Sequence, residues 1–152
     1  MFFYLQRKIF TFNPQNEKMK HVLTMLIAFT FVITACNHSA EINKTDPLES
    51  GRGFIEASLK GDYVEAKKYL LNDSSNNEYF EGLKDFNSKM SRAERAGLRD
   101  ANIIIDSTHQ VSDSVNIIAY SNTYKNVPSK LKMVKRNNEW LVDFKYTFLG
   151  NQ

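Results

Sequence analysis

Cys36 is the only cysteine among the 152 residues, and its thiol is the most nucleophilic side chain in the sequence. A single cysteine excludes a disulfide within one chain, and Cys36 with His38 is two ligands short of a zinc site. A lone cysteine is most often a buried, inert thiol. Cys36 instead ends an apolar run and begins a polar one, so we expect it to be a site of covalent attachment. The sequence predicts no metal site and no cofactor.

Proton abstraction would require a carboxylate or a histidine on the wall of a cavity. The candidates nearest the predicted strands are Asp106, His109 and Asp143. Because Asp143 alternates with Val142 and Phe144, we expect it to face solvent. Asp106 and His109 lie near a strand end, and no second titratable residue is paired with either. The sequence therefore predicts surface positions for all three and no catalytic constellation.

The twelve uncharged residues from Val22 to Ile33 have the length of the apolar region of a signal peptide. A membrane-spanning helix needs about 20 apolar residues, so the run is too short for a stable span. Lys18 and Lys20 supply the positive flank. The next residues, Ile33-Thr34-Ala35-Cys36, resemble the lipobox that bacterial lipoprotein signal peptidase recognises. This resemblance implies cleavage before Cys36 and attachment of a lipid to its thiol.

These features divide the chain into three parts. Residues 1–35 are expected to be a signal peptide, residues 36–46 a lipidated polar tether and residues 47–149 a folded domain. Translation starts at Met1 or, in a leader of more ordinary length, at Met19. Because Asn37 follows the cysteine where an aspartate often signals inner-membrane retention, we expect a lipid-anchored protein of the cell envelope, in the outer membrane.

The formal charge of +3 belongs to the expected leader. Of the 20 Lys and Arg residues and the 17 Asp and Glu residues, four and one, respectively, precede Cys36. The rest of the chain is therefore neutral. A neutral domain lacks the basic surface that binding to nucleic acid requires.

Helical signals begin at Asp46-Pro47-Leu48-Glu49, where an N-cap aspartate precedes a proline suited to the first turn. Gly61 should end this helix, and Asp62-Tyr63-Val64-Glu65 should cap a second. The polar residues 72–77 are expected to form a loop. A third helix should follow from Glu78, with Ser91 either restarting or bending it.

After residue 100 the pattern changes to strands. Segments starting at Ile103, Val115 and Leu131 are rich in β-branched and apolar residues, and apolar side chains alternate from Trp140 to Leu149. Asn137-Asn138 should form the tight turn between the last two strands. Helices followed by meander strands predict an α+β domain, with N-terminal helices packed on one face of a four-stranded antiparallel sheet.

Aromatic side chains of the strand region suit the walls of a pocket for an apolar ligand. The candidates are Tyr120, Tyr124, Trp140, Phe144, Tyr146 and Phe148. The alternative is an ordinary core against Phe80, Leu83 and Phe86, because a small domain needs most of its aromatics there. Basic residues of the same region, Lys130, Lys132, Arg136 and Lys145, are expected to form a solvated face or, alternatively, a patch for anionic headgroups or an acidic partner.

The segment from Phe54 to Tyr63, with its Gly61-Asp62-Tyr63 between two helices, resembles the opening of small nuclear transport factor 2-like domains. Residues 131–143 resemble their closing hairpin, in which a basic strand turns into one that carries a tryptophan. Both segments resemble the domain-of-unknown-function family numbered 4878. The resemblance covers about residues 48–147 and implies a curved sheet that cups a long helix around a conical cavity. No catalytic motif of that superfamily matches here, so no role is transferred.

Two classes of function fit these observations. One is a non-enzymatic module, anchored to the membrane by its lipid, that binds a small apolar ligand or another envelope protein. The other is an enzyme of the same fold that abstracts a proton in the cavity. A purely structural envelope component differs from the first class only in its partner. A buried acid with a perturbed pKa on a cavity wall would favour the enzyme.

Overall fold

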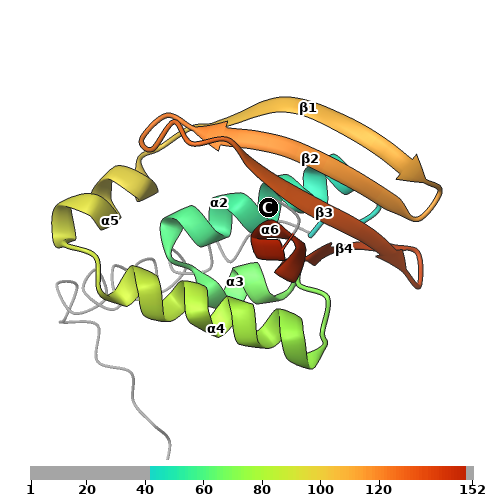
Figure 1. The fold of residues 1–152 in the computed structure, drawn as a ribbon, viewed down its shortest axis with the longest axis horizontal. Helices are drawn as coiled ribbons and strands as arrows, with labels where there is room; N and C mark the ends of the chain where they lie inside the picture. Colours follow the sequence, from blue (N-terminus) through green and yellow to red (C-terminus); the bar gives the residue numbers. More distant parts are fainter. Residues whose placement is uncertain (1–41, 150–152) are drawn as a thin grey trace, which may run out of the picture. The chain divides into compact units, whose positions relative to one another are not determined.

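The computed structural model describes residues 42–149, which form an α+β domain with helices on one side of a bent sheet (Figure 1). The expected signal peptide, the lipobox and Cys36 lie outside the described residues. The helices are α2 (Pro47–Lys60), α3 (Tyr63–Lys67), α4 (Ser74–Ser88), α5 (Arg92–Arg99) and α6 (Lys145–Leu149). The strands are β1 (Ile103–Ser112), β2 (Val115–Asn122), β3 (Ser129–Arg136) and β4 (Glu139–Asp143). None of these helices is long and apolar enough to cross a bilayer.

The predicted starts of the first two helices are confirmed. The Asp46 side chain caps α2 by accepting a hydrogen bond from the backbone N–H of Glu49 at 2.9 Å, and Asp62 caps α3 in the same way. Gly61 ends α2 with a φ of 75°, a left-handed conformation that glycine adopts without steric cost. Local sequence therefore defines this helix pair.

The expected loop over residues 72–77 is wrong, because α4 already begins at Ser74. Asp73 is the N-cap, and its carboxylate accepts the backbone N–H of Asn76 at 2.8 Å. The polar run is the first turn of the helix, where short polar side chains satisfy free backbone N–H groups. Ser91 starts a new helix, α5, and forms a reciprocal capping box with Glu94.

The four strands form one antiparallel sheet in the order β1-β2-β3-β4, as the meander prediction requires. The β3–β4 turn has positive φ at both Asn137 (49°) and Asn138 (65°), which confirms the predicted tight turn. The outer edge of β4 is covered by backbone, because the Val142 N–H donates to the carbonyl of Tyr69 and the Trp140 N–H to that of Lys44.

The prediction that the last strand runs to Leu149 is wrong. Strand β4 ends at Asp143, and residues Lys145–Leu149 form the short helix α6. The alternation of apolar residues continues in the sequence beyond Asp143. The backbone N–H of Lys145, however, donates to the side-chain carbonyl of Asn76 at 2.9 Å and not to a neighbouring strand. A contact with the start of α4 therefore turns the chain away from the sheet.

Helix α2 packs against the inner face of the sheet, and two glycines allow this. A side chain at Gly51 would place its first carbon 2.5 Å from Ile118 of β2, and one at Gly53 would come within 2.6 Å of the Tyr69 ring. The two glycines that weaken the helix locally thus bring it close to its neighbours. The buried core comprises Phe54, Ile55, Ala57, Ala66, Tyr69, Leu70, Phe80, Ile118, Leu131, Met133, Trp140, Val142 and Phe144.

Candidate functional site

A cavity of about 450 Å³ opens between α2, α4, α5, α6 and the loop that follows β2. Its volume lies within the usual range for small-molecule sites. Its walls are mainly apolar. They comprise Phe54, Ile55, Ser58, Leu59, Leu83, Phe86, Asn87, Met90, Leu98, Tyr120, Asn122, Lys125, Val127, Ser129, Phe144, Thr147 and Phe148. Phe86, which the sequence predicts as core, is 63% exposed and lies on this wall instead.

Three of the six aromatic candidates, Tyr120, Phe144 and Phe148, line the cavity. Trp140 is buried, with 7% of its surface exposed, and belongs to the core. The Tyr124 ring packs over Gly97, where a methyl group would come within 2.3 Å of it. The aromatic candidates are thus divided between the cavity wall and the core, and Phe144 belongs to both.

Tyr146 also lies away from the cavity walls. The ammonium group of Lys132 lies 5.7 Å from the centre of its ring, within the range of a cation–π contact. This contact belongs to the region around α6 and β3. Tyr146 is therefore a packing partner of a lysine rather than a wall residue of the apolar cavity.

The polar side chains of the cavity walls are hydroxyls, two asparagine amides and one lysine, Lys125. The hydroxyl oxygen of Ser58 is buried and has no hydrogen-bond partner in the described part of the chain. Burial raises the pKa of Tyr120, and a hydrogen bond with Ser129, its neighbour across the strands, opposes that rise. Tyr120 therefore stays protonated at neutral pH. Because an unpartnered buried hydroxyl is costly, Ser58 marks a position where a ligand oxygen would be stabilised.

No aspartate, glutamate or histidine lines this cavity. Asp106 and His109 are exposed on β1, and Asp106 lies at an irregularity of the β1–β2 pairing between Ile105 and Ser107. The surface positions predicted for these two residues are confirmed. Among residues 42–149, no three His, Cys, Asp or Glu side chains are grouped so as to hold a metal ion.

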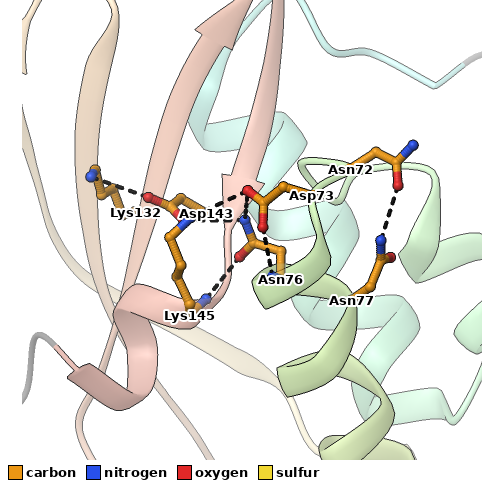
Figure 2. Close-up of polar contacts among 7 residues, drawn as sticks. All are labelled: Asn72, Asp73, Asn76, Asn77, Lys132, Asp143 and Lys145. Carbon is orange, nitrogen blue, oxygen red and sulfur yellow. Dashed lines mark hydrogen bonds and ion pairs between the residues drawn. The ribbon is translucent and has the colours of Figure 1, made fainter.

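The prediction that Asp143 faces solvent is wrong, because only 6% of its surface is exposed. Asp143 does lie on the face of the sheet opposite to Val142, directly across from Lys132 of β3. The strand ends there, however, and other groups close over the carboxylate. Figure 2 shows Lys132, Lys145 and Asn76 around Asp143. The two ammonium groups lie 3.1 and 3.0 Å from its oxygens, and the Asn76 amide donates at 3.3 Å.

This cluster fixes the end of β4 to the start of α4. Burial by itself would raise the pKa of Asp143, but the hydrogen bonds from Lys145, Lys132 and Asn76 together outweigh it, and the pKa is lowered. Lys145 also pairs with the α4 cap Asp73 at 3.2 Å. Asp143 is thus a charged structural residue away from the apolar cavity. Two of the four residues predicted as a basic face, Lys132 and Lys145, are partners of this carboxylate.

Sequence reasoning missed Ser58 and Leu98 as cavity residues. Ser58 lies within an apolar helical stripe, and Leu98 lies on a short helix, α5, without fully buried residues. No local signal distinguishes such positions from ordinary helix surface. Only the packing of α5 beside α2 and α4 gives them a cavity to line.

Comparison of the chain with models of protein families, with curated proteins and with solved structures gives no match.

Proposed function

We propose that this chain is a lipid-anchored cell-envelope protein whose domain binds a small, mainly apolar ligand without transforming it. The observation that carries this proposal is the cavity of about 450 Å³, with apolar walls and a buried, unpartnered hydroxyl at Ser58. Apolar walls supply the driving force of binding, and a few polar groups orient the ligand. The proposed attachment at Cys36 would keep the domain close to a membrane.

An enzyme that abstracts protons is less well supported by the same geometry. Such an enzyme needs a base within hydrogen-bond reach of its substrate, with a pKa near the working pH. The buried carboxylate of Asp143 is held by two lysines, has a lowered pKa and does not line the cavity. Binding therefore remains the preferred proposal. A purely structural envelope component would differ from a binding protein in that its cavity would hold no ligand.

The resemblance to nuclear transport factor 2-like domains is part of the proposal. In its favour are the order of helices before a meander and the sheet that bends over α2 (Figure 1). A cavity lined in part by that helix also favours it. The resemblance implies a conical cavity between the sheet and a long helix. The fold itself, however, does not specify the ligand.

Filling the cavity is expected to weaken binding. Leu98→Trp adds bulk to a wall residue. The assay labels the full-length protein in isolated membranes with a neutral, diazirine-bearing decanol. Labelling should fall about tenfold, because overpacking a site costs about 1–3 kcal/mol. The control Ala93→Trp adds the same ring to an exposed position of α5 that does not line the cavity. Equal labelling of the two variants would contradict the proposal. Absence of labelling in the wild type would contradict it as well.

Lipidation at Cys36 can be tested separately. Cys36→Ser removes the thiol, so the variant should take up no radiolabelled palmitate and should accumulate as a precursor that still carries its leader. The measurement is metabolic labelling followed by immunoprecipitation, and sucrose-gradient fractionation of the wild type tests the outer-membrane assignment. A Cys36→Ser protein that retains the label would refute the lipoprotein proposal.

A further inference from the structure

The structure contains a second cavity, of about 500 Å³, beside the apolar one. We infer that the two cavities together form one site for an anionic amphiphile: a molecule with a single apolar chain, which occupies the apolar cavity, and a carboxylate or phosphate head, which occupies the second. This inference rests on the proposed function, because it names the class of ligand for the same site.

The second cavity has a basic lining. Its residues are Ser58, Leu59, Lys60, Gly61, Tyr63, Lys84, Asn87, Ser88, Arg95, Leu98 and Arg99. Four of them are cationic, and no aspartate or glutamate is among them. A concave surface of one charge raises the local concentration of oppositely charged ligands. We call this the basic cavity.

The four cations are neutralised to different degrees. Lys60 and Lys84 each form an ion pair at 2.6 Å, with Glu56 and Glu81, outside the cavity lining. The Arg95 guanidinium donates to the backbone carbonyl of Met90, which follows α4. Arg99, on the last turn of α5, has no side-chain partner within the part of the chain that the structure describes. A guanidinium without a carboxylate partner is well suited to a bidentate anion.

The two cavities share four wall residues, Ser58, Leu59, Asn87 and Leu98. A ligand that extends from one cavity to the other would lie against these four residues, among them Ser58, whose hydroxyl oxygen has no hydrogen-bond partner in the described part of the chain. An oxygen at the head of the apolar chain would accept a hydrogen bond from this hydroxyl. The same side chain that lacks a partner thus stands at the junction where the proposed ligand changes from apolar to charged.

Lys125 offers a competing position for the head. It lines the apolar cavity, and its ammonium group lies 5.3 Å from the centre of the Tyr124 ring. It is a single cation, however, whereas the basic cavity provides four, two of them also paired with glutamates outside its lining, together with the Ser58 hydroxyl. We therefore place the head group at Arg99 and Lys84 and treat Lys125 as the alternative that the experiment must exclude.

The test uses the full-length protein in isolated membranes and three diazirine-bearing probes with the same ten-carbon chain: a carboxylic acid, a phosphate monoester and an alcohol. The wild type should be labelled more strongly by at least one anion than by the alcohol, and the stronger anion identifies the head group. Labelled peptides should carry residues of the apolar cavity, such as Leu83 or Met90. In Lys84→Gln/Arg99→Gln, anion labelling should fall about tenfold, as the loss of two partly exposed ionic contacts implies, and alcohol labelling should stay within about twofold.

Arg92→Gln serves as the control, because it removes one positive charge from an exposed position of α5 outside both cavities, and it should retain anion labelling. Lys125→Gln tests the competing position of the head inside the apolar cavity. Loss of anion labelling in Lys125→Gln, or equal labelling of the wild type by acid, phosphate and alcohol, would overturn the placement of the head while the apolar site stands. Absence of labelling by all three probes would remove the proposed function as well.

Discussion

Asp143→Ala is expected to lower the free energy of unfolding by about 3 kcal/mol. The substitution leaves Lys132, Lys145 and the Asn76 amide without their shared acceptor, and removing one partner of a buried ion pair costs about 3–5 kcal/mol. We expect the lower end of that range, because the lysine side chains are 30% and 33% exposed and can be rehydrated. Urea denaturation of the chain from Ala40 onward, followed by the fluorescence of its single tryptophan, measures the effect.

The matched control for this substitution is Asp106→Ala, which removes an exposed carboxylate of β1. A surface change of this kind should alter stability by about 0.5 kcal/mol or less. If Asp143→Ala unfolded at the same urea concentration as the control, the cluster would be a surface feature without energetic weight. Asp143 lies away from both cavities, so its effect on stability can be measured separately from ligand binding.

The same carboxylate should give the protein a distinct sensitivity to acid. The folded-state pKa of Asp143 lies below its ordinary value of 3.8, so its contribution is fully present above that value. As the pH falls through the lowered pKa, protonation removes the contribution, because the unfolded state binds the proton more readily. The wild type should therefore lose stability below about pH 4, whereas Asp143→Ala should lose less over the same interval.

Trp140→Ala is expected to have the largest effect, a loss of about 3–5 kcal/mol of unfolding free energy. The side chain is 7% exposed and belongs to the core, and the Trp140 carbonyl accepts a hydrogen bond at 2.6 Å from the buried hydroxyl of Ser50 on α2. Truncation would leave a cavity between β4 and that helix. Thermal unfolding monitored by circular dichroism at 222 nm is the measurement.

Trp140→Phe keeps an aromatic ring in the core and should cost clearly less than Trp140→Ala. A loss below about 1 kcal/mol for Trp140→Ala would show that the ring is not packed as the structure describes.

The circular dichroism spectrum of the wild type provides a check on the fold. It should contain both helix and strand contributions, and an all-helical spectrum would refute the α+β domain.

The sequence by itself determined those parts of the fold that depend on neighbouring residues. Asp46 and Asp62 cap the helices predicted for them, Gly61 ends the first helix, and Asn137-Asn138 turns between the last two strands. Each of these features is a hydrogen bond or a backbone conformation within a few residues. The order of helices and strands followed from the change of apolar period, which is also a local property.

The tertiary structure alone decided the rest. Asn76, distant in sequence, binds the backbone of Lys145 and ends β4 where the apolar alternation would continue it. The same contact encloses Asp143, whose outward direction the sequence predicts but whose burial it does not. The two cavities arise because α5 packs beside α2 and α4. Strand alternation indicates only which way a side chain points, whereas burial and cavities depend on what another part of the chain places there.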